Sequence, residues 1–166
     1  MAESYEPRAT RPTLPSGYEV PTDEAGLQPW SHARTRLEQA QNFWVCTATR
    51  AGKPHAAPLW GAWVDDRLSF EGSPATRWGR NLSANPQASV HLERGSDVVI
   101  VERAILDEDD VGAALAERIA SFAARYNGYR TQRRGFFILV PRGALAWSRF
   151  PHDATRWACD DAPGRA

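Results

Sequence analysis

Long hydrophobic runs, paired cysteines and an excess of charge of either sign are all missing from this sequence of 166 residues. No apolar stretch is long enough to span a bilayer, and the first residues are polar and proline-rich, unlike a signal peptide. The 20 Lys and Arg residues balance the 20 Asp and Glu residues, so the net charge favours neither nucleic acid nor a membrane as a partner. The sequence predicts a soluble cytoplasmic protein.

Motifs for several common chemistries are also absent. The two cysteines, Cys46 and Cys159, lie in a predicted strand and in a polar tail, which is typical of free thiols in a reducing compartment. Serine hydrolase, P-loop and dinucleotide-binding glycine patterns do not occur, which excludes those enzyme classes. No metal site is expected, because no metal-ligand spacing connects the four histidines, His32, His55, His91 and His152.

The chain divides by composition into three parts. Residues 1–29 carry prolines, glycines and charges without a hydrophobic period, which predicts a flexible or wrapping N-terminal arm. Residues 30–157 contain the periodic apolar pattern of one compact domain, and residues 158–166 form a polar C-terminal tail.

Within the domain, alternating apolar residues predict antiparallel strands joined by tight turns, with helices inserted between them. The expected helices are 31–41, 74–85 with Ser73 as its N-cap, and 108–126; the expected strands are 42–48, 54–64, 68–71, 88–92, 98–106, 136–140 and 144–147. No strand–helix–strand rhythm of a parallel sheet is present. The pattern therefore favours an α+β barrel over a doubly wound fold.

Three runs of this pattern resemble a known family. FWVCTATRAGKPHAAPLWGAW, RLSFEGSPATRWGRNLSANPQASVHLERG and DVVIVE are similar to the pyridoxamine 5′-phosphate oxidase-like superfamily, and in particular to its flavin- and deazaflavin (coenzyme F420)-dependent oxidoreductases. The resemblance covers about residues 30–157. It implies an antiparallel split β-barrel of the FMN-binding type and a homodimer with two cofactor sites at the subunit interface.

The resemblance also implies a reaction, which is hydride transfer between bound FMN or coenzyme F420 and a small organic substrate. No side chain stands out as a general acid or base, so the cofactor is expected to carry the chemistry. Two alternatives stay open: a non-catalytic cofactor- or haem-binding protein, and a true pyridoxamine 5′-phosphate oxidase. In the dimer, residues 98–101 and 136–140 are expected in or beneath an apolar interface.

The segment around residues 73–81 is the sharpest local feature. A helix N-terminus offers unpaired N–H groups and partial positive charge, and Thr76, Arg77 and Arg80 follow within about a turn. The resemblance assigns phosphate binding to these three residues, whereas the residues alone would favour an exposed, solvated helix. Trp78 stands where many relatives have a lysine, and it is expected to stack or to pack at the dimer interface.

A second candidate region is the expected strand 54–64. In relatives, the backbone of this strand lies along the edge of the flavin ring, and the resemblance places His55, Pro58 and Trp60 near the cofactor. Near the end of the chain, Trp157 is a further candidate, which either reaches the partner's pocket or anchors the tail. The competing interpretation of these aromatic residues is that they belong to the core.

Overall fold

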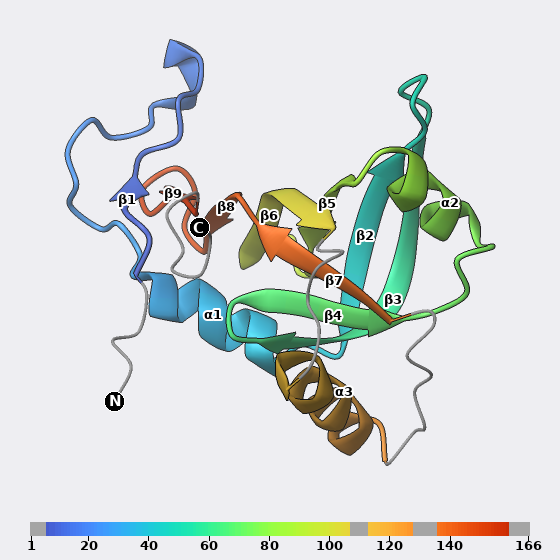
Figure 1. Cartoon of the computed structure of the whole chain (residues 1–166). Coiled ribbons are helices and arrows are strands. Elements are labelled where there is room, and N and C mark those ends of the chain that lie inside the picture. Colours follow the sequence, from blue (N-terminus) through green and yellow to red (C-terminus); the bar gives the residue numbers. More distant parts are fainter. Residues whose placement is uncertain (1–5, 107–112, 128–135, 160–166) are drawn as a thin grey trace.

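A computed structural model describes residues 6–106, 113–127 and 136–159, and it has the α+β architecture that the sequence predicts (Figure 1). Within these residues, three α-helices and one short 3-10 helix accompany the sheet. They are η1 (Ser16–Tyr18), α1 (Trp30–Gln39), α2 (Arg77–Ala84) and α3 (Ala113–Arg125). The strands are β1 (Ala9–Thr10), β2 (Asn42–Ala48), β3 (Pro54–Val64), β4 (Arg67–Glu71), β5 (Gln87–His91), β6 (Val98–Leu106), β7 (Phe136–Pro141), β8 (Gly143–Trp147) and β9 (Thr155–Ala158).

All strand pairings in the described sheet are antiparallel, in the order β1-β9-β8-β6-β5-β2-β3-β4-β7. The additional pairing of β6 with β7 closes six of these strands into a ring. Strand β6 serves both parts of the sheet, because its first half pairs with β8 and its second half with β7. The result is a split barrel with β8, β9 and β1 extending from it.

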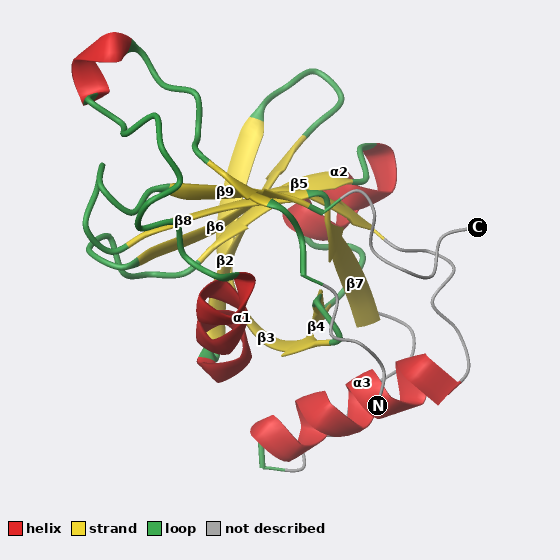
Figure 2. Ribbon diagram, turned by 90° about the vertical axis from the view of Figure 1, so that its left-hand side faces the viewer, coloured by secondary structure: helices red, strands yellow, loops and turns green. Residues whose placement is uncertain are grey.

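The inner face of the sheet carries the core. Along β2, buried Phe43, Val45 and Thr47 alternate with half-buried residues, as the two-residue period of a strand requires. Helix α1 covers this face with Trp30, Ala33 and Leu37, all less than 2% exposed. Figure 2 shows α1 and α3 below the centre of the sheet and η1 projecting above it. In the part of the chain described, no helix is long and apolar enough to cross a membrane.

The N-terminal segment lies against the sheet. Strand β1 pairs with β9, placing Ala9 opposite Trp157. The guanidinium of Arg11 donates to four carbonyl oxygens, those of Asp23, Ala25, His152 and Ala154. The bonds to His152 and Ala154 tie the arm to the loop between β8 and β9. Composition did not reveal this, because a two-residue strand has no period to detect.

The expected start of the third helix, at 108, lies outside the described residues; among the helix ends that are described, the largest difference from expectation concerns the start of α2. It begins at Arg77 with Thr76 as N-cap, three residues after the predicted cap Ser73. Ser73 instead starts a turn, in which its hydroxyl accepts from the N–H of Ala75 and its carbonyl accepts from Thr76. The turn packs tightly on the helix, since a Cβ at Gly79 would lie 2.8 Å from the Pro74 carbonyl oxygen. Both Ser73 and Thr76 are good caps, and packing decides between them.

Candidate functional site

The hydroxyl of Thr76 makes its hydrogen bonds to its own helix and to the turn before it. Its Oγ1 accepts from the Gly79 N–H at 3.1 Å and donates to the Ser73 carbonyl at 2.8 Å. A hydroxyl has one proton to donate, so Thr76 cannot also donate to a phosphate without giving up the bond to Ser73. Its observed role is to cap the helix and to fix the direction in which the following arginines leave it.

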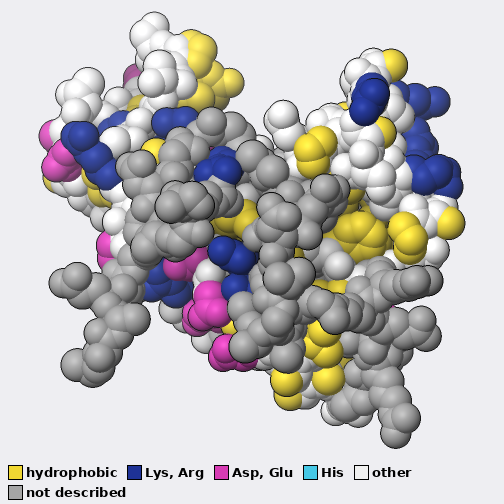
Figure 3. Space-filling view, viewed as in Figure 1, with side chains coloured by type: hydrophobic (Ala, Val, Ile, Leu, Met, Phe, Trp, Pro, Cys, Tyr) yellow, Lys and Arg dark blue, Asp and Glu magenta, His cyan; other side chains and the backbone are white. Residues whose placement is uncertain are grey.

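The two arginines of α2 point into solvent. Both side chains are exposed. Arg80 donates through one nitrogen to the Ala75 carbonyl, and Arg77 has no hydrogen bond or ion pair with any described residue. Arg50, on the neighbouring β2–β3 turn, donates to the carbonyl of Ala84 at the other end of the helix. Figure 3 shows Lys and Arg side chains gathered at this end of the molecule, which gives it a local positive charge that the neutral whole chain does not have.

Strand β3 has an open edge beside α2. All its residues from 54 to 60 pair with β2, but its pairing with β4 covers only Gly61–Val64. The backbone of residues 54–60 therefore has no strand on its second side within the described sheet. Pro54 and Pro58 stand on this edge, as expected of residues that cannot donate to a ladder. The remaining N–H and C=O groups of the edge need partners, and a polar planar ring can supply them.

The register separates the three candidate residues of β3. Pro58 and Trp60 are exposed on the outer face of the sheet, opposite Trp44 and Asn42 of β2. His55 is half-buried on the other face, opposite Thr47, and α2 reaches that same face through a 3.0 Å bond from Asn81 to Thr47. The candidate residues of β3 therefore lie on both faces of the sheet, and the open edge of β3 lies between these faces.

Trp60 is 58% exposed and stacks on Tyr126, which directly follows α3, with ring centroids 5.0 Å apart. The Tyr126 hydroxyl accepts from the Gly61 N–H and contacts the carbonyl oxygens of Gln41 and Gly61. Burial raises the pKa of this phenol, and the Gly61 bond and the nearby Arg125 charge offset only part of the effect. Tyr126 therefore stays neutral and anchors α3 to the end of the open edge.

On the outer face of the sheet, one row of side chains is not fully covered by any described element. Across β3, β2, β5, β6 and β8 the register places one residue of each strand side by side: Pro58, Trp44, His91, Ile100 and Leu145. Pro58 is exposed and the other four are half-buried. No local sequence signal marks Trp44, His91 or Leu145, because only strand pairing reveals that they share a row.

Two tryptophans that were candidates for contacts outside the core lie within it. Trp78 is 5% exposed and packs edge-to-face on Phe70 and Phe137. It therefore neither lies on the surface nor replaces a phosphate-binding lysine. Trp157 is fully buried against Trp30, with centroids 5.4 Å apart, so its ring anchors β9 and we leave it out of the proposed site.

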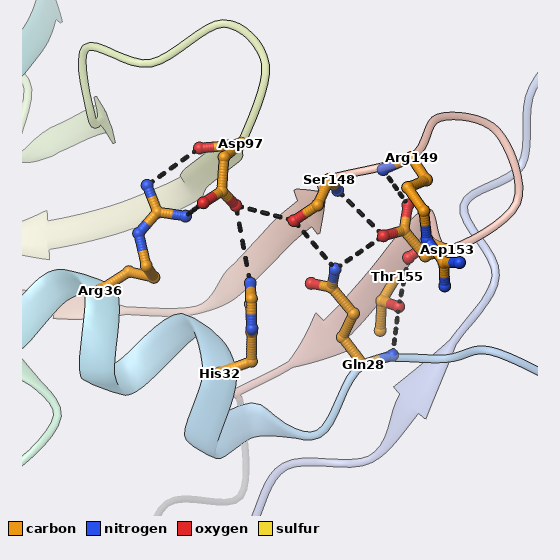
Figure 4. Close-up of polar contacts among 8 residues, drawn as sticks. All are labelled: Gln28, His32, Arg36, Asp97, Ser148, Arg149, Asp153 and Thr155. Atoms are coloured by element: carbon orange, nitrogen blue, oxygen red, sulfur yellow. Dashed lines mark hydrogen bonds and ion pairs between the residues drawn. The ribbon is translucent and has the colours of Figure 1, made fainter.

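The polar cluster in Figure 4 joins α1, the β5–β6 turn and the β8–β9 loop. Asp153 accepts from the backbone N–H groups of Ser148 and Arg149 and from the side chain of Gln28, at 2.8–3.0 Å. Asp97 accepts from Ser148 and pairs with Arg36. Burial would raise the pKa of both carboxyl groups, but the hydrogen bonds outweigh it and lower each pKa. These carboxylates are structural, because their donors come from the chain itself.

A shallow cleft of about 270 Å³ opens on the outer face and is lined in part by Cys46, Ser89 and Glu102. Both cysteines are free thiols, and burial raises the pKa of Cys46. A thiol with a raised pKa is a poor nucleophile. Glu102 pairs with Arg156 of β9 at 3.6 Å. The cleft therefore offers no activated group.

A family model named pyridoxamine 5′-phosphate oxidase matches residues 30–144, more than half of the chain. The chain belongs to the pyridoxamine 5′-phosphate oxidase family. The match includes the open β3 edge, α2 and the outer-face row up to β6. The resemblance stated from the sequence is thus confirmed at the level of family and fold.

Solved structures of the same fold include both haem-binding and FMN-binding proteins. A haem-binding protein from Mycobacterium smegmatis is 18% identical, with a TM-score of 0.62; the match covers 80% of this chain and 59% of that one. A conserved hypothetical protein from Mycobacterium tuberculosis is 21% identical, with a TM-score of 0.59 and coverages of 76% and 89%. An FMN-binding protein from Syntrophomonas wolfei is 14% identical, with a TM-score of 0.57 and coverages of 72% and 86%.

At these identities the similarity shows the shared fold and leaves the ligand of this family member open. No curated protein matches the chain.

Proposed function

We propose that this protein is a homodimeric oxidoreductase that binds a flavin or a deazaflavin through residues 30–157 and transfers a hydride between that cofactor and a small organic substrate. The observation that carries the proposal is the open β3 edge beside the outward-facing arginines of α2. FMN and coenzyme F420 both combine a polar planar ring with a phosphate on a flexible side chain. The open edge matches the polar ring and the arginines match the phosphate, which supports the proposal.

The phosphate end is assigned to Arg77 and Arg80. Guanidinium groups form directed and often bidentate hydrogen bonds to phosphate oxygens. The N-terminus of α2 adds the partial positive charge of the helix. Thr76 contributes by holding the first turn in shape, since its hydroxyl is engaged within the helix.

The ring is assigned to the open edge of β3 and the adjoining outer face. Backbone groups of residues 54–60 hold the polar rim of the ring, Pro58 supplies a flat apolar contact, and Trp60, fixed by Tyr126, limits the site at one end. When bound, the cofactor supplies the hydride chemistry. The chain itself orients the ring and excludes water from it.

A second copy of the chain is proposed to cover the outer face. Val98 and Ile100 lie on this face and are half-buried in the single chain. In the other run expected at the interface, residues 137–140 are at most 9% exposed within the chain and so lie beneath the surface. The row of the outer face, apolar except for His91, is the surface that a dimer would bury.

Absorbance spectroscopy of the purified protein, before and after adding FMN, coenzyme F420 or haem, tests the proposal. A bound flavin or deazaflavin changes the spectrum of its own chromophore, and light scattering on the same sample gives the oligomeric state. Stoichiometric FMN or coenzyme F420 in a dimer is the expected result. Exclusive binding of haem, or binding of none of the three, would overturn the proposal.

A further inference from the structure

His91 and Trp44 form an ordered pair on the outer face of the sheet. They are direct partners across β5 and β2, and their rings are nearly parallel, with centroids 6.2 Å apart and an interplanar angle of 6°. Both side chains are half-buried. Stacking against an indole restricts rotation of the imidazole, so His91 presents its nitrogens in fixed directions.

A hydrogen bond assigns the protons of the His91 imidazole. Its Nδ1 lies 3.0 Å from the carbonyl oxygen of Leu92. A carbonyl can only accept, so Nδ1 carries the hydrogen, and in the neutral ring Nε2 is left with a lone pair. No described residue donates to this Nε2. The indole N–H of Trp44 likewise has no hydrogen-bond partner among the described residues. The pair therefore offers one fixed acceptor and one donor.

The pair lies within reach of both parts of the proposed site. Trp44 is also the direct partner of Pro58 on β3, and strand spacing places His91 about 10 Å from Pro58 across the sheet. Along β2, Trp44 is three residues, or about 10 Å, from Thr47, which bonds to Asn81 of α2. A ring that enters over the open edge of β3 and lies on the outer face reaches the Trp44–His91 pair.

We propose that the Trp44–His91 pair binds the imide edge of the flavin or deazaflavin ring, with His91 Nε2 accepting from the ring N–H and the Trp44 indole donating to a ring carbonyl. This inference rests on the proposed function and adds the residues that would orient the ring. Imide edges present one N–H between two carbonyl oxygens. An oriented acceptor beside a donor complements this pattern better than an apolar surface does.

The test uses the full chain labelled with ¹⁵N and observes the imidazole nitrogens by NMR. His91→Gln identifies the His91 signals among those of the four histidines. Free protein should show His91 with its proton on Nδ1. In the FMN-saturated protein, the Nε2 signal of His91 should shift as it accepts a hydrogen bond, while His152, an exposed residue of the β8–β9 loop, should not respond.

Affinity gives the second measurement. His91→Phe keeps a ring to stack on Trp44 but removes the acceptor, and it should weaken FMN binding about fivefold, as expected for loss of one neutral hydrogen bond. His91→Gln retains an acceptor and should restore part of the loss. His152→Phe is the matched control and should bind FMN as the parent does.

The outcomes separate the two proposals. FMN that binds with unchanged His91 signals and equal affinity in His91→Phe would overturn this inference and leave the proposed function standing. If neither FMN nor coenzyme F420 binds, both fail. Haem that binds with His91 as an axial iron ligand, lost in His91→Phe, would also overturn the assignment, because the lone pair of Nε2 would then serve a metal.

Discussion

At the β8–β9 end of the sheet, the carboxylates of Asp97 and Asp153 find their partners within the chain, whereas at the α2 end the guanidinium of Arg77 does not. Asp153 accepts three hydrogen bonds from neighbouring segments, and Asp97 is held by Ser148 and Arg36. Arg77 by contrast makes no hydrogen bond to a described residue, and Arg80 uses one nitrogen of its guanidinium. Buried charges without partners are costly, so partnered charges at one end indicate a role in folding.

The exposed arginines, by contrast, have no such role in folding. Surface charges cost little when left in water, so the fold does not need Arg77 and Arg80 paired. Together with an open strand edge and an apolar outer face, they form a region whose hydrogen-bonding groups remain available. The difference between the ends separates residues that hold the fold from residues free to bind, and each of the following experiments acts on one side of that division.

Ile100→Asp should have the largest effect, and it concerns the outer face. A carboxylate buried in an apolar dimer interface without a partner costs about 3–5 kcal/mol, which weakens dimerisation roughly a hundred- to several thousandfold. Sedimentation or light scattering at micromolar concentration should show a folded monomer. Glu93→Ala, on an exposed turn, is the control and should remain dimeric. A dimer that persists in Ile100→Asp would place the interface elsewhere.

Asp153→Ala should lower the free energy of unfolding by about 3 kcal/mol, because it removes a charged acceptor and leaves its buried donors unpaired. Urea denaturation at neutral pH measures this loss. FMN affinity of the folded fraction should be unchanged, since Asp153 belongs to the other end of the sheet. A loss below about 0.5 kcal/mol, typical of surface substitutions, would contradict a structural role for the cluster.

Arg80→Ala should have the opposite effects, which are weaker FMN binding and unchanged stability. Loss of a charge-assisted bond to phosphate costs about 1.5–3 kcal/mol of binding, or roughly a ten- to hundredfold loss of FMN affinity. The urea midpoint should not move, because the exposed guanidinium makes one bond to its own helix turn. Arg149→Ala, an exposed arginine at the far end, should leave both quantities unchanged. Equal FMN affinity in Arg80→Ala and the parent protein would remove α2 as the phosphate site.

Much of the fold could be predicted from the sequence, because it depends on local periods. Strand β3 has the bounds predicted for it, and the α+β barrel class follows from alternating strands without a parallel rhythm. The beginning of α2 was misplaced because Ser73 and Thr76 are equally good caps in sequence terms. Strands β1 and β9 were missed because they are short and their pairing joins distant ends of the chain.

The candidate site was less predictable for a related reason. Sequence patterns can nominate Arg77 and Arg80 from their place after a cap, but they cannot show that Thr76 has already donated its proton. They also grouped His55 with Pro58 and Trp60, although the register puts His55 on the opposite face. His91 carries no local signal at all. Its relation to Trp44 exists only across paired strands.

The smallest expected effect is the response of stability to acid. The folded-state pKa of Asp97 and of Asp153 is lowered, so each carboxylate stays charged in the folded chain at a pH where it is protonated in the unfolded chain. Their contribution is fully present above the unfolded pKa of about 3.9 and is lost as the pH falls through the lower folded values. Urea midpoints measured from pH 6 down to pH 2.5 should therefore decline below about pH 4. Asp97→Asn combined with Asp153→Asn should flatten this decline, because neither amide titrates, whereas Glu93→Gln should leave its slope as in the parent. An equally steep decline in the double variant would assign the acid sensitivity to other carboxylates and weaken the division between the two ends of the sheet.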